Sequence, residues 1–228
     1  PPEAFTLAET LITLGIIGVV CAITIPSLIQ KHKLQVLHNQ FKQAYSILAQ
    51  VHQQMINDDI SPYNNFVTNQ IITDEIANTH IETVAKYLNA KVCNNKYTNC
   101  TGGNGYKTIT GNAGAHIDAD AYTKKTILLN NGMTIWRGGL TYYRNRYYID
   151  INGTAKGPNK LGYDLFTFEI DKQDKLIPEK NNANISKSCS FSNPAQSNSY
   201  IGFGCAYYAL TDEHPEIAGK SYWKDFLK

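Results

Sequence analysis

Methionine and tryptophan are scarce in this chain, and neither sign of charge dominates. The 228 residues include 2 Met and 2 Trp, and 21 Lys and Arg residues stand against 19 Asp and Glu residues, giving a net charge of +2. Nucleic-acid-binding surfaces rely on a basic excess, and solvating tails rely on a block of acidic charge. The composition argues against both, and we expect no nucleic acid partner.

Recognisable catalytic groupings are also missing. The sequence shows no grouping of Ser, His and Asp, or of Cys and His, that argues for catalysis, and its 6 histidines lack the spacing of metal ligands. Glycines gather at 101–105, but without the GxxxxGK[ST] pattern of a phosphate-binding loop. We expect a protein that is not an enzyme and needs no cofactor. His38 and His52 are expected to face solvent or a neighbouring molecule.

The most prominent feature present is an apolar run from Phe5 to about Ile29, which contains a single acid, Glu9. A helix of about 20 such residues crosses a lipid bilayer, and a carboxylate within it costs about 2.5–3.5 kcal/mol on insertion scales. Glu9 is either a tolerated polar residue of a membrane anchor or a group that awaits a cation from another copy of the chain. A cleaved secretory signal is disfavoured, because the run is too long and no A-x-A-like cleavage site follows it.

The helical pattern continues beyond the apolar run. Apolar residues recur at alternating intervals of three and four, which predicts an amphipathic helix as far as about residue 57. These residues are Leu34, Leu37, Phe41, Ala44, Leu48, Val51 and Met55. Pro26 should kink or loosen the apolar half. Gly15 and Gly18 should lower helix stability there and allow another helix to approach closely.

The remainder reads as an α+β head. Residues 73–88 have helical periodicity, whereas 93–122 are rich in Gly, Asn and Thr, and 180–228 are also expected to be mostly loop. The predicted strands are 126–129, 133–136, 142–151 and 164–170. The first two flank an Asn-Gly turn, which predicts a hairpin. We expect an antiparallel sheet of about four strands packed on the long N-terminal helix.

Alternation along the third of these strands places Arg144, Arg146, Tyr148 and Asp150 on one face. Arginine side chains beside tyrosine rings could bind DNA or another anionic surface. A solvated strand face is the favoured interpretation.

Four of the five cysteines form two local pairs in loop-like sequence. The simplest pairing is Cys93 with Cys100 and Cys189 with Cys205, as disulfides formed in an oxidising compartment. A four-cysteine zinc site is the alternative, although neither pair has CxxC spacing. Cys21 lies in the apolar run and reads as a small hydrophobic residue.

The N-terminus carries a short motif, Ala4-Phe5-Thr6-Leu7-Ala8-Glu9, followed by Gly15, Gly18 and Pro26. It resembles the cleavage and methylation site of type IV pilins and type II secretion pseudopilins, although Ala4 stands where glycine is usual. The resemblance implies cleavage by a prepilin peptidase after Ala4 and an N-methylated Phe5. It also implies that Glu9 neutralises the N-terminal amine of an adjacent subunit.

This resemblance also implies the organisation of the chain. Residues 1–4 would be a leader remnant, 5–30 a transmembrane and filament-core helix, 31–58 an amphipathic stem, and 59–228 a globular head. The expected protein is a structural subunit of an extracellular helical filament, inserted in the inner membrane as a precursor and assembled with copies of itself by dedicated machinery. The alternatives are a pseudopilin of a periplasmic pseudopilus and a single-pass anchored binding domain that does not polymerise.

One metal site is considered. Asp150, Asn152 and Asp164 gather around a Gly-rich turn, and oxygen ligands suit calcium. Some pseudopilins bind calcium in a comparable loop. The alternative is turn chemistry, in which these side chains cap the backbone.

Overall fold

The computed structural model describes residues 6–67, 73–102, 105–112, 125–138, 146–179, 189–191 and 201–227. The chain forms two compact units, Pro1–Val36 and Leu37–Lys228. Helix α1 (Leu7–Asn57) begins in the first unit and ends in the second. The unit boundary therefore falls within the expected stem, most of which belongs to the same unit as the head.

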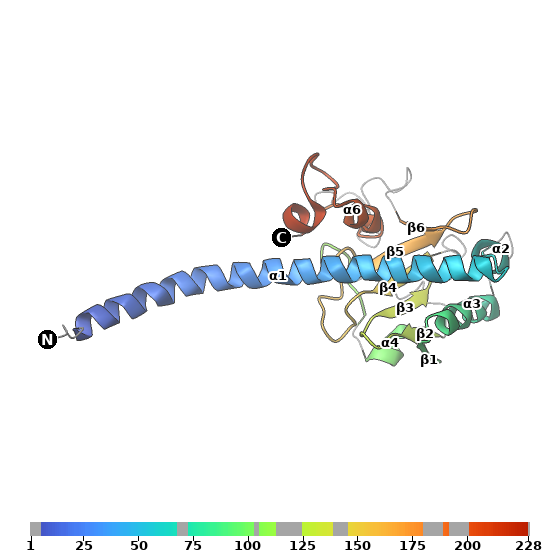
Figure 1. Cartoon of the computed structure of the whole chain (residues 1–228), viewed down its shortest axis with the longest axis horizontal. Coiled ribbons are helices and arrows are strands. Elements are labelled where there is room, and N and C mark those ends of the chain that lie inside the picture. The colour runs from blue at the N-terminus through green and yellow to red at the C-terminus, as the bar shows by residue number, and fades with distance from the viewer. Residues whose placement is uncertain are drawn as a thin grey trace. The chain divides into compact units, whose positions relative to one another are not determined.

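The described part of the first unit is helical from Leu7 onward (Figure 1). The helix runs unbroken through Pro26. The prediction of one helix from the apolar run to about residue 57 is confirmed for Leu7–Asn57, and the expected leader remnant, residues 1–4, lies outside the described residues.

The second unit contains a six-stranded sheet in the order β1-β2-β3-β4-β5-β6, with every neighbouring pair antiparallel. The strands are β1 (Lys91–Cys93), β2 (Thr126–Leu128), β3 (Thr134–Arg137), β4 (Arg146–Asp150), β5 (Leu165–Ile170) and β6 (Leu176–Pro178). Strands β2 to β5 correspond to the four predicted ones, although 142–145 lie outside the described residues. The sheet therefore has two more strands than the four or so predicted, and both additional strands are edge strands.

The physical reason for that error is the length of the edge strands. Each edge strand has three residues, too few to display an alternating pattern, and β6 ends in proline, which argues against a strand by sequence.

One face of the sheet packs on the C-terminal part of α1. The buried side chains of that helix are Leu37, Phe41, Ala44, Leu48, Val51, His52 and Met55. The ring of Phe41 lies 4.5 Å from that of Phe166 and 5.8 Å from that of Phe168, both on β5. The predicted apolar stripe from Leu37 onward is therefore the stripe that faces the core.

The other face of the sheet is covered as well. Trp136 and Tyr148 stack there with their ring centroids 5.4 Å apart, and the ring of Tyr97 stacks on Trp136 at 4.3 Å. Tyr106, Leu161, Leu165 and Phe203 complete this cluster of buried residues. Every residue of β3 and β4 is buried, as expected for strands with both faces covered.

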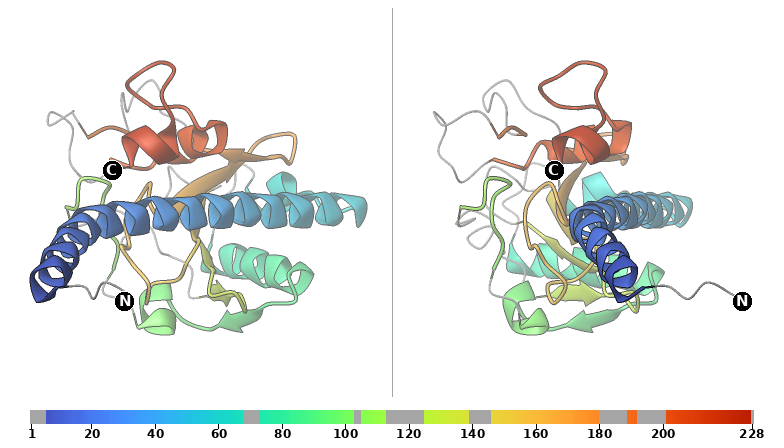
Figure 2. Two further views of the ribbon diagram at one scale, coloured as in Figure 1. Left: turned by 60° about the vertical axis from the view of Figure 1, so that its left-hand side comes forward. Right: turned by 90° about the vertical axis from the view of Figure 1, so that its left-hand side faces the viewer.

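Short helices flank the sheet in the head. They are α2 (Pro62–Phe66), α3 (Asp74–Tyr87), α4 (Tyr97–Thr101), α6 (Cys205–Thr211) and the π-helix η2 (Tyr222–Phe226). Figure 2 shows α3 and α4 towards the β1–β2 end of the sheet and α6 towards the β5–β6 end. The prediction of a helix at 73–88 is confirmed by α3, whereas α4, α6 and η2 lie in segments expected to be mostly loop.

Candidate assembly segment

The first unit presents its apolar side chains to solvent. Leu7, Leu14 and Ile23 are 79%, 66% and 72% exposed. By length and composition, α1 contains a segment able to cross a bilayer. None of that segment is buried inside the protein. A signal sequence near an N-terminus would meet the same test of length and composition. An exposed apolar surface of this extent marks a site of contact with lipid or with another protein.

Glu9 caps the helix that carries this surface. The amide and the hydroxyl group of Thr6 each donate a hydrogen bond of 2.8 Å to Oε2 of Glu9, and the Glu9 amide lies 3.3 Å from Oγ1 of Thr6. This reciprocal pair is a capping box, and a carboxylate at this position also interacts favourably with the helix dipole. Within the described residues, the other carboxylate oxygen of Glu9 accepts no hydrogen bond.

This capping role of Glu9 was not predicted from the sequence, which raised only the question of which cation pairs with the carboxylate. The Thr-x-x-Glu spacing of Thr6 and Glu9 would have revealed it. Ala4 and Phe5, the residues on either side of the expected cleavage site, lie outside the described residues.

Gly15 and Gly18 have no packing partner in the described residues that requires glycine. A Cβ atom added at either position would meet nothing within 4 Å. Glycine inside a helix is less favourable than alanine by about 0.8–1.0 kcal/mol, so the two residues weaken the helix without a gain elsewhere in the described chain. Both glycines, like Pro26, lie in the exposed apolar stretch of α1. The small size of the two glycines would allow another helix to approach closely there.

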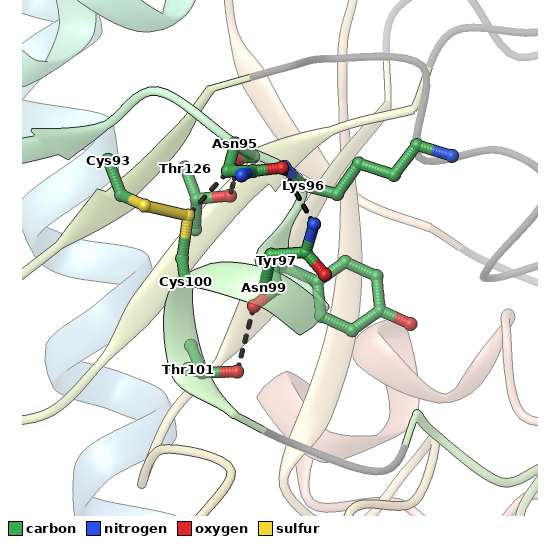
Figure 3. The surroundings of a disulfide bond; sticks show 8 residues. All are labelled: Cys93, Asn95, Lys96, Tyr97, Asn99, Cys100, Thr101 and Thr126. Atoms are coloured by element: carbon green, nitrogen blue, oxygen red, sulfur yellow. Dashed lines mark hydrogen bonds between the residues drawn. A yellow bond between two sulfur atoms is a disulfide. The ribbon is translucent and has the colours of Figure 1, made fainter.

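The cysteine pairs of the head are disulfides, Cys93–Cys100 and Cys189–Cys205, and Cys21 is free. The simplest pairing is confirmed, and the zinc alternative is wrong. Figure 3 shows the first bridge between β1 and α4, beside a carbonyl oxygen of Asn95 that accepts a hydrogen bond of 3.0 Å from the hydroxyl group of Thr126. The second bridge is buried and fixes the start of α6 to residues 189–191.

The structure brings the calcium candidates Asp150, Asn152 and Asp164 into one buried region. Oδ1 of Asp150 accepts hydrogen bonds from the amides of Asn152 and Gly153, at 3.1 and 2.7 Å, and Oδ2 accepts one of 2.5 Å from the hydroxyl group of Tyr106. All of these donors compete with a metal ion for the carboxylate.

Asp164 is engaged in the same way. Its two carboxylate oxygens accept hydrogen bonds of 2.7 Å from the amides of Asn159 and Lys160. Burial raises the pKa of Asp164 to about 7 and that of Asp150 above its usual value. The described residues contain no group of three or more His, Cys, Asp and Glu side chains that could hold a metal ion. The geometry favours the turn-capping interpretation over a preformed calcium site.

A buried polar cluster joins the stem to the sheet. The Tyr147 hydroxyl group on β4 lies 3.1 Å from Nε2 of His52 on α1 and 2.7 Å from Nε2 of His80 on α3. A hydroxyl group has one proton to donate, so one neutral imidazole accepts from Tyr147 and the other donates to it. Burial lowers the pKa of His52 to about 4 and that of His80 well below its usual value. The expectation that His52 faces solvent or a neighbour is wrong, because it lies on the buried stripe of α1.

Arg146 is also buried. Its guanidinium group pairs with the carboxylate of Glu179 and lies 4.5 Å from the ring centroid of Phe203. The prediction of a solvated strand face is wrong, because Tyr97, Tyr106 and Phe203 cover that face of the sheet. The guanidinium group is consequently closed to an external anion such as DNA, while Arg144 lies outside the described residues.

Comparison with known proteins adds no relative: no protein-family model, no curated protein and no solved structure matches the chain.

Proposed function

We propose that this chain is a structural subunit of a type IV pilus-like helical filament, held in the inner membrane before assembly and exposed at the cell surface afterwards. The observation that supports this most is the exposed apolar stretch of α1, of which the described protein buries nothing. The resemblance of residues 4–9 to a prepilin processing site supports it independently.

The driving force follows from the exposed surface. Apolar surface removed from water contributes about 25 cal/mol per Å², so a stretch that leaves lipid must be covered by other apolar surface. Copies of the same stretch supply it. Contacts between different patches of successive copies propagate a filament when the rotation between copies does not close into a ring, and this is the arrangement that we propose.

Glu9 would fix the register of these contacts. In lipid or in a filament core a lone carboxylate needs a cation, and the resemblance assigns this cation to the N-terminal amine of an adjacent copy. The capping box accounts for the hydrogen bonds to one carboxylate oxygen and leaves the other available. The disulfide-closed head, with both faces of its sheet covered, would form the outer surface.

Electron microscopy of material sheared from cells tests the proposal, with N-terminal sequencing of what is released. We expect fibres composed of this chain that begin at Phe5. Fibres confined to the periplasm, or seen only on overproduction, would favour the pseudopilin alternative. A chain that stays in the membrane fraction and yields no fibre would contradict the proposal and favour the non-polymerising anchor.

A further inference from the structure

A group of basic side chains is spread around α1 directly beyond its apolar stretch. Lys31, His32 and Lys33 are consecutive in the sequence, and all three side chains are exposed. Successive residues of an α-helix point about 100° apart, so Lys31 and Lys33 lie on nearly opposite sides of α1, with His32 between them. The three side chains occupy more than half of the helix circumference instead of forming one face, and we refer to them as the cationic collar.

The collar has no acidic counterpart on its own helix. Residues 10–57 contain neither aspartate nor glutamate, so no ion pair between neighbouring turns of α1 is available. Within the described residues neither Lys31 nor Lys33 takes part in an ion pair, whereas Lys125 of the head pairs with Glu82 on α3. The collar is thus a local excess of positive charge that the described chain leaves uncompensated.

The position of the collar along α1 matches the headgroup layer of a membrane. From Leu7 to Ile29 the helix rises by about 33 Å at 1.5 Å per residue, close to the roughly 30 Å of a bilayer's hydrocarbon core. Lys31 and Lys33 follow Ile29 by about 3 and 6 Å, and the headgroup layer is about 5–7 Å thick on each side. When the apolar stretch lies in lipid, the collar therefore lies at the level of the phosphate groups.

The collar also lies on the side of the membrane where cations are least expected. The disulfides Cys93–Cys100 and Cys189–Cys205 indicate that the head folds in an oxidising compartment. The part of α1 that follows the apolar stretch must be on the same side, because it leads directly into the head. Lysines that flank a membrane helix favour the cytoplasmic side, so the collar opposes the orientation that the head requires. A contact with anions at the membrane surface would compensate for this conflict.

We propose that the cationic collar binds the phosphate groups of anionic phospholipids in the membrane that holds the precursor. Charge complementarity selects this partner, because a cluster of cations beside a membrane helix attracts anionic headgroups. The arrangement of the side chains selects it as well: lipids surround a helix on every side, whereas a folded protein would contact only one side of the collar. The inference rests on the membrane-held stage of the proposed function and does not require fibre assembly.

Lipid retention by the full chain tests the collar. The chain is titrated in detergent micelles with phosphatidylglycerol or with phosphatidylcholine, and native mass spectrometry counts the lipids that stay bound. We expect the unmodified chain to bind phosphatidylglycerol about tenfold more tightly than phosphatidylcholine, and Lys31→Gln/Lys33→Gln to lose this preference. Lys172→Gln/Lys175→Gln removes the same charge from exposed positions of the head and should keep the preference. Lys31→Arg/Lys33→Arg, which retains both charges, should keep it too.

The outcomes separate this inference from the proposed function. Equal binding of the two lipids by the unmodified chain, or an equal preference in the collar and head variants, would overturn the inference, and fibres from such a chain would leave the proposed function intact. A preference that persists when the salt concentration is raised from about 0.05 to about 0.5 M would also contradict a contact with phosphate groups, because salt screens exposed charges. A salt-sensitive preference in a chain that never forms fibres would keep the inference and contradict the filament. Circular dichroism of each variant in detergent must match that of the unmodified chain.

Discussion

The hydroxyl group of Tyr147 lies 2.7 Å from Nε2 of His80, although the two residues come from a central strand and a separate helix. The same hydroxyl group reaches His52 on α1, so a single oxygen atom links three elements inside the core. Its position explains how a stem helix with an otherwise apolar inner face is held in one register on the sheet. An apolar contact tolerates sliding, whereas a buried hydrogen bond does not.

Replacing Tyr147 by phenylalanine should therefore destabilise the head. The change removes one oxygen atom and leaves two buried imidazole nitrogens without their partner. We expect a loss of about 2 kcal/mol in the free energy of unfolding, measured by urea denaturation of the full chain in detergent. Tyr63→Phe, at a partly exposed ring, should change stability by less than about 0.5 kcal/mol. Equal losses of unfolding free energy in the two variants would contradict a special role for the buried hydroxyl group of Tyr147.

Acid should weaken the same cluster through His52. Its pKa is lowered by burial to about 4 from an unfolded value of about 6.5, so the unfolded chain takes up a proton first. The contribution of His52 is fully present above about pH 6.5 and is lost as the pH falls towards 4. At about 1.4 kcal/mol per pH unit, the loss amounts to about 3 kcal/mol. His80 contributes in the same direction.

The measurement is the slope of unfolding free energy against pH between 6.5 and 4, compared between variants. Variants must be compared because Asp164 changes the free energy of unfolding in the opposite direction. Burial raises the pKa of Asp164 to about 7, so its contribution to stability is full below about pH 4 and is lost as the pH rises through 7. We expect His52→Gln to reduce the acid-side loss and His32→Gln, at an exposed position, to leave it unchanged. Identical slopes for the unmodified chain and His52→Gln would contradict the assignment.

Periodicity accounts for the parts of this fold that the sequence predicted. The intervals between apolar residues specified α1, and the Asn131-Gly132 turn specified the β2–β3 hairpin. The same helical pattern could have placed His52 in the core, because it follows Leu48 by four residues and precedes Met55 by three. Its polarity led to the wrong expectation.

The covered second face of the sheet could not be predicted in this way. Its cover comes from segments with no regular period, where Tyr97, Tyr106 and Phe203 stand among glycine, asparagine and threonine. Without that cover Arg146 reads as solvated. For the assembly segment the situation is reversed, since the apolar run and the spacing of Thr6 and Glu9 are both legible from the sequence.

Loss of either disulfide should destabilise the head, and loss of the longer loop should do so more. Cys189–Cys205 closes a separation of 16 residues and Cys93–Cys100 one of 7. Loop-closure entropy predicts losses of about 3 and about 2.5 kcal/mol for the respective double alanine variants. Urea denaturation under oxidising conditions measures both. A negligible loss for Cys189→Ala/Cys205→Ala would contradict a stabilising role for the closure of this loop.

The substitutions Gly15→Ala and Gly18→Ala distinguish the stability of the single helix from the packing of helices in the assembly. Each change should favour the helix by about 0.8–1.0 kcal/mol, and neither added methyl group would meet an atom of the described chain. If another helix approaches at these positions, the same methyl groups obstruct it and fibre yield falls. Val20→Leu adds a methyl group to an exposed residue on the opposite side of the helix and provides the control for added bulk. Normal fibres from the double glycine variant would mean that no close approach occurs there.

Glu9 offers the sharpest test, because its two proposed roles respond differently to a neutral isostere. Glutamine serves as well as glutamate in a capping box, so Glu9→Gln keeps the contact with Thr6 but loses the charge, whereas Glu9→Ala loses both. If Glu9 answers a cation of an adjacent copy, both variants remain in the membrane fraction and yield few fibres, since an unpaired buried partner costs about 3–5 kcal/mol. If Glu9 only caps the helix, Glu9→Gln assembles normally and Glu9→Ala is impaired. Fibre counts by electron microscopy, normalised to the membrane content of each variant, decide between them.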